Sequence, residues 1–302
     1  MKSEDGAMNS TTGSILVTGS SGFLGGNVAR HLASSGHAVR GFDLISPTSH
    51  DISTTIGDLT DAQSVMAAVA GFDTVVHFGG IGDTELATRD PALAASVNVV
   101  GTTNIGLAAA RHDARVLYAS TWEVYAPQIS GEIDENFALA PSDAYSVSKL
   151  GGELMLGALH ESQGLRVAIL RLGTAFGTGM RPNSVFERFT HAAQNGEVLS
   201  VHGDGGQFRQ FTHATDIALG VERVIDQPWA SEVINLVAPE VVTILQLAEI
   251  VADRYGSSIE FVPSRSIDPP SSIVSSAKAH LLYGWEPAAP FSERMNTYLT
   301  QR

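Results

Sequence analysis

Residues 14–34, SILVTGSSGFLGGNVARHLAS, place a strand, a glycine-rich turn and a helix in direct succession. The first five residues are mostly apolar or β-branched and predict a strand, which ends at the glycines at 19, 22 and 25. Glycine has no Cβ, so the chain can turn tightly and bring its N–H groups to a diphosphate at the positive end of the helix dipole. The pattern predicts a dinucleotide-binding turn, although its GxxGxxG spacing alone is a weak signal.

A carboxylate ends the second expected strand, at Asp43. In a dinucleotide-binding fold, an acid at this place accepts hydrogen bonds from the adenosine ribose hydroxyls. It would repel a 2′-phosphate, and no Arg or Lys follows within the next several residues. NAD is therefore expected rather than NADP. The third expected strand closes at Asp58, which would face the adenine amino group, cap the helix that begins near Asp61, or do both.

Short apolar strands alternate with longer helical patterns from residue 14 to about residue 172. Strands are expected at 73–78, 115–119 and 166–170, with helices through 97–104 and from about 144 to 161. This alternation predicts an α/β fold of Rossmann type, in which a doubly wound parallel sheet has right-handed crossovers. Ligands of such folds lie at the carboxyl ends of the strands.

Tyr145 and Lys149 stand four residues apart at the start of an expected helix, so they share one helical face. A nearby ammonium stabilises phenolate, and we expect Lys149 to lower the tyrosine pKa from about 10 toward neutrality, so that the phenol can act as a general base. Thr121, two residues beyond the strand expected at 115–119, would orient the same substrate hydroxyl. Alone, such a pair is more often solvated surface; the glycine turn upstream favours the catalytic interpretation.

Composition limits the partners of the chain. Its 302 residues are 43% hydrophobic, enough for a large core, and 18 basic against 32 acidic side chains give a formal charge of −14. That charge argues against nucleic acid and anionic membranes. No apolar run of membrane-spanning length and no signal peptide are expected, so a cytoplasmic protein is predicted. Cysteine is absent and the ten histidines show no close ligand pairing, so no metal site is predicted.

A series of motifs resembles the extended short-chain dehydrogenase/reductases, in particular the NAD-dependent epimerase/dehydratase branch that acts on nucleotide sugars. The resemblance covers nearly the whole chain. Its motifs are GSSGFLGG at 19–26, the acid at 43, GDL at 57–59, HFGG at 77–80, NVVGTTN at 98–104, YASTWEVYA at 118–126, YSVSK at 145–149 and GDGGQFRQFTHATDIA at 203–218.

The resemblance implies roles for these residues. Tyr145 would be the catalytic base, Lys149 would bind the nicotinamide ribose and tune the tyrosine, and Thr121 would complete the triad. The residues implied to contact NAD are Gly19, Gly22, Phe23, Leu24, Gly25, Asp43, Asp58, Leu59, Phe78, Gly79, Asn98, Tyr145 and Lys149.

The resemblance also implies a domain organisation. Residues 1–12 would be a disordered lead-in, residues 13–172 the NAD-binding Rossmann domain, and residues 173–302 a smaller α/β substrate-binding domain interleaved with strands that return to the main sheet. Helices near 92–112 and 144–163 carry more small and apolar residues than one core face needs, and relatives pair the matching helices. A homodimer is therefore expected.

Three residues are implied to contact a nucleotide-sugar substrate: Thr121, Thr174 and Arg209. Arg209 matches the position that holds the substrate diphosphate in the family, and a planar guanidinium suits this task. The alternative is a surface arginine paired with Asp204 or Glu197. Thr174 stands where many members have asparagine, so this contact departs from the family pattern.

The pair Trp122-Glu123 also departs from the family pattern. Sugar-nucleotide 4,6-dehydratases commonly place Asp-Glu after the threonine, and indole cannot protonate a leaving hydroxyl, which weakens the case for dehydration. Simple 4-epimerases usually have a small residue in place of Glu123. Its carboxylate would remove a proton at carbon 5, assist a decarboxylation, or serve only as a buried acid bonded to backbone N–H groups.

The implied reaction begins when Tyr145 removes a proton from a sugar hydroxyl, at carbon 4, while hydride passes to NAD and leaves a 4-keto sugar. Return of the hydride to the other face makes the protein a 4-epimerase, which is the favoured hypothesis. Use of Glu123 on the ketone makes it a dehydratase or decarboxylase. A net NAD-dependent dehydrogenase or ketoreductase and a non-catalytic NAD-binding protein are further alternatives, and the intact triad disfavours the last.

Overall fold

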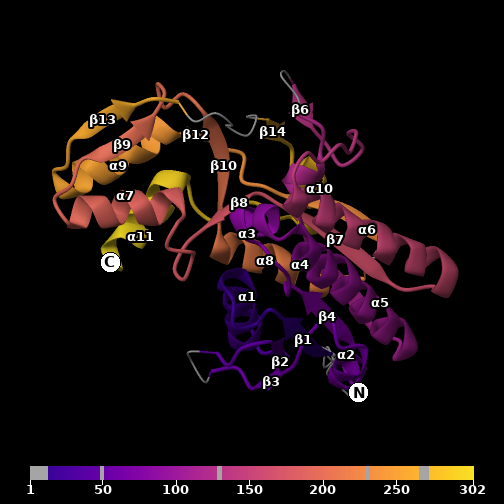
Figure 1. Ribbon diagram of the computed structural model, residues 1–302. Helices are drawn as coiled ribbons and strands as arrows, with labels where there is room; N and C mark the ends of the chain where they lie inside the picture. Colours follow the sequence, from indigo (N-terminus) through magenta and orange to yellow (C-terminus); the bar gives the residue numbers. More distant parts are fainter. Residues whose placement is uncertain (1–12, 48–50, 128–130, 229–230, 265–271) are drawn as a thin grey trace, which may run out of the picture.

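The computed structural model describes residues 13–47, 51–127, 131–228, 231–264 and 272–302. The lead-in predicted at residues 1–12 lies outside these ranges. The described chain forms a larger lobe around a parallel sheet and a smaller lobe that contains α7, α9 and α11 (Figure 1).

The larger lobe is built on seven parallel strands in the order β11-β7-β5-β4-β1-β2-β3. The order reverses between β1 and β4, which creates the crevice where such sheets bind ligands. The predicted Rossmann-type fold is confirmed. The strands are β1 (Ser14–Thr18), β2 (Ala38–Asp43), β3 (Thr54–Ile56), β4 (Thr74–His77), β5 (Arg115–Thr121), β7 (Val167–Leu172) and β11 (Glu232–Leu236).

Helices cover both faces of this sheet because its strands are apolar on both sides. In β1, Ile15 and Val17 face one apolar cluster and Leu16 faces the other, as the two-residue period of a strand requires. The first cluster is completed by α1 (Phe23–Ser34), α8 (Ala214–Ile225) and α10 (Ala277–Tyr283), and the second by α2 (Ala62–Val69), α5 (Thr102–Arg111) and α6 (Ala144–Gln163).

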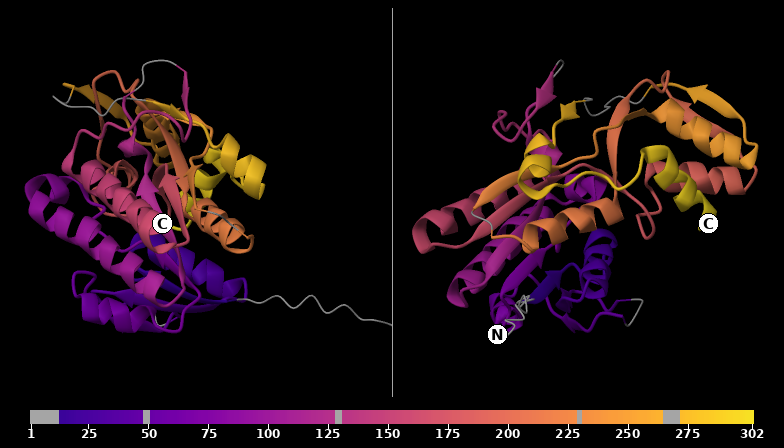
Figure 2. Two further views of the ribbon diagram at one scale, coloured as in Figure 1. Left: turned by 90° about the vertical axis from the view of Figure 1, so that its right-hand side faces the viewer. Right: turned by 180° about the vertical axis from the view of Figure 1, so that it is seen from behind.

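A long helix precedes β5, and its middle is wound as a π-helix. It consists of α4 (Pro91–Ala95), the π-helical turn η1 (Ser96–Gly101) and α5, and it follows the short α3 (Thr84–Arg89). By length and composition this helix is able to cross a membrane, so the expectation that no apolar run reaches that length is wrong. Core helices pass the same test, and 44% of its apolar window is buried in the protein. It lies side by side with α6 (Figure 2).

The smaller lobe packs short sheets against three helices, α7 (Val185–Gln194), α9 (Ile244–Tyr255) and α11 (Phe291–Thr300). Its core contains Phe176, Phe186 and Phe211; the rings of Phe176 and Phe186 stack with centroids 4.9 Å apart. The sheets are β12-β10-β8, β13-β9 and β14-β6, formed by β6 (Glu132–Ile133), β8 (Thr174–Phe176), β9 (Leu199–His202), β10 (Phe208–His213), β12 (Val241–Thr243), β13 (Ile259–Val262) and β14 (Ile273–Val274). Because β11 lies beyond residue 172 yet pairs with β7, the C-terminal part interleaves with the main sheet.

A buried ion pair joins α6 to the sheet. The Arg171 guanidinium on β7 lies 2.6 Å from the Glu153 carboxylate on α6, and each side chain is only 4% exposed. The same carboxylate accepts a hydrogen bond from the Ser120 hydroxyl on β5. Arg171 also lies over the ring of Tyr125, 4.7 Å from its centroid. These contacts fix α6 against the strand end that carries Thr121.

Replacing Arg171 by Met should lower the free energy of unfolding by about 3–5 kcal/mol, because the Glu153 carboxylate would stay buried without its counter-charge. Urea denaturation at neutral pH measures the loss. Arg166→Met is the matched control, since Arg166 pairs with Asp113 on the exposed surface and its loss should be much smaller. Equal losses in the two variants would contradict this assignment of the buried pair.

Candidate active site

The glycine turn after β1 allows backbone to meet backbone with no side chain between. Gly19 has a φ of +71°, and a Cβ there would lie 2.7 Å from the Gly79 nitrogen. A Cβ on Gly25 would lie 2.1 Å from the Gly19 carbonyl oxygen and 3.3 Å from the Phe78 Cβ. The first turn of α1 therefore lies against the turn after β1 and the loop after β4. Its N-cap is Gly22, which has no side chain to accept its N–H groups, so these groups suit a diphosphate.

Asp43, at the end of β2, holds the glycine turn from the other side. One carboxylate oxygen accepts the N–H of Ser21 at 2.8 Å, and the other accepts the N–H of Ile45 at 3.1 Å. A carboxylate has about four lone-pair sites, so these bonds leave acceptors for the ribose hydroxyls of NAD. The position of the acid beside the turn agrees with the predicted role.

Asp58 does not cap α2, so that alternative is wrong. The N-cap is Asp61 itself, whose side chain accepts the Gln63 N–H, while Asp58 accepts the Thr60 N–H at 2.8 Å. Leu59 packs over the loop after β4. The residues predicted to contact the adenosine and diphosphate parts of NAD lie along the carboxyl ends of β1 to β4 and the start of α1: Gly19, Gly22, Phe23, Leu24, Gly25, Asp43, Asp58, Leu59, Phe78 and Gly79.

Asn98 lies in the π-helical turn and is buried. Its side-chain oxygen accepts the Ile81 N–H at 2.7 Å, and its nitrogen donates to the Ile81 carbonyl at 3.0 Å and to the Ser148 hydroxyl at 2.8 Å. It therefore connects the loop after β4 with the turn of α6 that carries Lys149. π-Helical turns often occur at functional positions, and this one places the Asn98 amide between the loop after β4 and α6, which border the expected NAD site.

The structure brings the predicted triad together. Thr121 ends β5, and its hydroxyl lies near enough to the Tyr145 phenol to lower the pKa of the phenol. Tyr145 lies in the first turn of α6, which Asp143 caps by accepting the Tyr145 N–H at 2.9 Å. Lys149 follows one turn later on the same helix and is buried, with its Nζ 4.2 Å from the centroid of the Tyr118 ring.

The expected lowering of the Tyr145 pKa is not found. Burial and then the Glu123 charge raise the pKa of Tyr145 well above its usual value, against smaller opposing effects such as the Thr121 hydrogen bond. Burial lowers the pKa of Lys149 to about 7, although the Glu153 charge raises it. Desolvation disfavours both phenolate and ammonium, and here it outweighs the stabilisation of phenolate that a neighbouring lysine charge would give.

Glu123 lies directly after Thr121, in the single 3₁₀ turn η2 (Trp122–Val124). Burial and then Asp143 raise the pKa of Glu123 to about 7, while the charges of Arg209 and Arg181 lower it. Within the described residues, no backbone N–H bond contributes to this shift, which disfavours the interpretation as a backbone-bonded acid. Near neutral pH the group is divided between its acid and its base forms.

Two arginines supply positive charge to this acidic chain at the site. Arg209 lies on β10, lowers the pKa of Glu123, and lines a small cavity with Trp122. Arg181 follows β8, pairs with Asp83 at 3.1 Å, and lowers the pKa values of both Glu123 and Tyr145.

Sequence reasoning did not single out Arg181. Its position, in the loop after the strand that Thr174 begins, follows no motif that marks it as a site residue. Thr174 itself lies on β8, which pairs with the strand that carries Arg209. The three residues predicted to contact the substrate lie on β5 (Thr121), β8 (Thr174) and β10 (Arg209), and their contact with a substrate stays a prediction.

Comparison with known proteins agrees with this geometry. Residues 15–236 match the NAD dependent epimerase/dehydratase family. The chain is 30% identical over 296 residues to UDP-glucuronic acid decarboxylase 1 of Danio rerio, over 93% of this chain and 71% of the relative. It is 28% identical over 300 residues to dTDP-glucose 4,6-dehydratase of Streptomyces niveus, over 92% and 89%.

A solved structure also superposes on the whole fold. MoeE5 in complex with UDP-glucose and NAD matches with a TM-score of 0.87 and 25% identity, over 95% of this chain and 98% of MoeE5. The predictions of an enzyme and of NAD as its cofactor are confirmed, since the relatives are nucleotide-sugar enzymes and the matching family is NAD-dependent. With its glycine turn, its acid at the end of β2 and its tyrosine and lysine on α6, the chain belongs to the NAD dependent epimerase/dehydratase family.

Proposed function

We propose that this protein is a nucleotide-sugar 4-epimerase that acts through a transient 4-keto sugar. The observation that carries the proposal is the placement of the Thr121 hydroxyl by the Tyr145 phenol, with the buried Lys149 one helical turn later, at the carboxyl ends of the strands. Relatives that act on UDP-glucuronic acid and dTDP-glucose, and a similar structure with UDP-glucose bound, support a sugar nucleotide as the substrate.

Each residue of the triad has a distinct task. Tyr145 accepts the proton of the carbon-4 hydroxyl, Thr121 holds the same hydroxyl in line with the phenol, and Lys149 supplies a buried positive charge. The glycine turn and Asp43 would hold NAD, which when bound would supply the hydride acceptor and a cationic ring that favours phenolate. Because burial and then the Glu123 charge raise the pKa of Tyr145, added positive charge at the site would favour the proton-accepting form of this phenol.

The diphosphate of the substrate needs fixed cations in a chain of charge −14. Arg209 on β10 and Arg181 after β8 would provide these cations, since the charges of both lower the pKa of Glu123 beside the triad. A guanidinium binds diphosphate oxygens through paired N–H groups. The cytoplasmic location predicted from the sequence fits a soluble nucleotide-sugar substrate and stays a prediction.

Incubation with UDP-glucose, UDP-glucuronic acid or dTDP-glucose and catalytic NAD should convert one of them to its 4-epimer, with unchanged mass and no build-up of NADH. Product NMR, mass spectrometry and NADH absorbance measure these outcomes. Tyr145→Phe should lower kcat by about 10²–10⁴-fold, because it removes the proton acceptor. Tyr283→Phe, on α10, is the control and should keep its rate. Stoichiometric NADH would instead indicate a net dehydrogenase and contradict the proposal.

Elimination or decarboxylation is the second candidate, and Glu123 favours it. With a pKa of about 7 beside Tyr145, its carboxyl group can accept or donate a proton once a ketone has made the neighbouring carbon acidic. The 30% identity with a UDP-glucuronic acid decarboxylase supports decarboxylation in particular. Trp122 supplies no acid for the loss of a hydroxyl.

Glu123→Gln should stabilise the protein above neutral pH. An unfolded glutamate ionises above about 4.5 but folded Glu123 only above about 7, so the wild type loses stability as pH rises between these values. Near pH 8 the variant should gain about 2–4 kcal/mol in free energy of unfolding, and near pH 4 nothing. Urea denaturation at both pH values measures the difference.

Glu197→Gln, at an exposed position, is the control and should give a much smaller gain. A Glu123→Gln variant that is no more stable than the wild type near pH 8 would contradict the assignment of Glu123 as a desolvated acid. The product of the same variant separates the two candidate functions: an epimerase keeps forming its epimer, whereas a decarboxylase or dehydratase loses its product of lower mass.

We further propose that the protein is a homodimer joined through α5 and α6, which lie side by side (Figure 2). Exposed apolar side chains on this helix pair include Val100 of η1, Leu107 of α5 and Leu154 of α6, the last with 63% of its surface accessible. A second copy would cover these side chains, including those of the long apolar helix at 91–111, without any membrane.

Sedimentation at micromolar concentration should show a species of about twice the chain mass of 31.8 kDa. Leu154→Lys should shift the protein to the single-chain mass, because it places a charge in the paired face. Leu281→Lys is the control, because Leu281 lies on α10 and is 81% exposed. This variant should remain a dimer, which would show that a charge at an exposed leucine does not by itself separate the two chains. A wild type that sediments as a single chain contradicts the dimer.

A further inference from the structure

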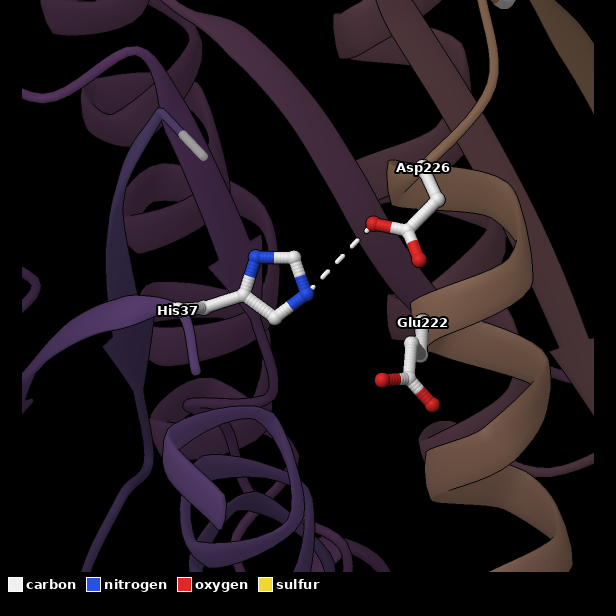
Figure 3. Close-up of side chains that lie close together, drawn as sticks. All are labelled: His37, Glu222 and Asp226. Atoms are coloured by element: carbon white, nitrogen blue, oxygen red, sulfur yellow. Dashed lines mark ion pairs between the residues drawn. The ribbon is translucent and has the colours of Figure 1, made fainter. Parts of the chain in front are cut away.

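A second cluster of ionisable side chains lies far from the triad along the sheet. Glu222 and Asp226 stand four residues apart, in the last turn and at the C-cap of α8, so they share a face. His31 lies in the last turn of α1, and His37 directly precedes β2. Helices of such sheets return the chain to the amino edge, opposite the edge that carries the triad. Figure 3 shows the ring of His37 directed at the two carboxylates.

The spacing of these groups is close to that of metal ligands. The His37 Nε2 lies 3.4 Å from an oxygen of Asp226, and ligand atoms of His37, Glu222 and Asp226 all lie within 4.8 Å of one another. Ligands about 2.0–2.1 Å from a tetrahedral Zn²⁺ are about 3.3 Å apart. The distance between His37 and Asp226 already matches this spacing. The other ligand–ligand distances would have to shorten by at most about 1.5 Å, which side-chain rotation can provide.

The surroundings favour a cation at this place. The His37 side chain is 7% exposed and Glu222 16%, whereas Asp226 is 52% exposed, so the cluster has two enclosed groups and one open side. The Glu222 carboxylate also lies 2.7 Å from the His31 Nε2, so a second imidazole borders the cluster.

We propose that His37, Glu222 and Asp226 bind one divalent transition-metal ion, with Zn²⁺ as the best match. Imidazole with carboxylates suits Zn²⁺ more than the hard cations Ca²⁺ and Mg²⁺, which prefer oxygen ligands alone. His31 holds Glu222 in place from outside the ligand set, as second-layer hydrogen bonds do in other metal sites. Water would complete the coordination on the open side of Asp226.

The proposed ion would have a structural role. It would fasten the end of α1 and the start of β2 to the end of α8, which belong to distant parts of the chain. The sequence gives no signal for it, because the two histidines are far in the chain from the two acids. This inference does not depend on the proposed epimerase activity, since it concerns the opposite edge of the sheet.

The test is titration of the EDTA-dialysed full chain with ZnCl₂, followed by calorimetry and by thermal unfolding. We expect one Zn²⁺ per chain with a dissociation constant below about 10 µM, and a rise in Tm of about 4 °C at a hundredfold excess over that constant. CoCl₂ should give the visible absorption bands of a four-coordinate, nitrogen-ligated ion.

The double variant His37→Gln/Asp226→Asn should bind Zn²⁺ at least tenfold more weakly and lose the rise in Tm. His280→Gln is the matched control, because His280 lies 4.0 Å from Glu286 on the exposed surface, and it should bind as the wild type does. Circular dichroism and retained NAD binding show that the double variant is folded. Binding weaker than about 100 µM in the wild type, or equal binding in the double variant, would mean adventitious surface binding and overturn the proposal.

Discussion

The close approach of three backbone segments is the constraint on which the rest of this structure depends. A side chain at residue 25 would enter the carbonyl of Gly19, and one at residue 19 would enter the backbone of Gly79. Without side chains at these places, β1, β4 and α1 meet closely enough to direct the N-terminus of α1 into the crevice where the strand order reverses. The charge of a dinucleotide is then met by backbone N–H groups, so a chain with few cations can still bind it.

Local patterns predicted much of the fold. The strand–turn–helix at residues 14–34, the helix from Ala144 and the strand that ends at Thr121 were predictable because periodicity and glycine placement act within a few residues. The same holds for Tyr145 and Lys149, whose separation of one helical turn determines that they share a face. The family motifs then linked these segments across more than a hundred residues and predicted where their ends would meet.

Properties that depend on tertiary packing were not predictable in this way. The pKa of Tyr145 moves opposite to expectation because desolvation is a property of the folded surroundings and leaves no mark on the sequence. Arg181 joins the site through the course of a loop, and Glu153 finds Arg171 only because α6 packs on β7. The N-cap of α2 is a further example: Asp58 and Asp61 both have a carboxylate that could cap the helix, and only the folded chain shows that Asp61 does so.

The π-helical turn at residues 96–101 has a consequence for the helix that contains it. One additional residue in a turn rotates everything that follows by about 100°. The segment before the turn and the segment after it therefore present differently phased faces: Asn98 points toward α6 and the expected dinucleotide, while Ile105 stays within the core. Residues 91–111 resemble a membrane span in length and composition only, and neither property registers this change of phase.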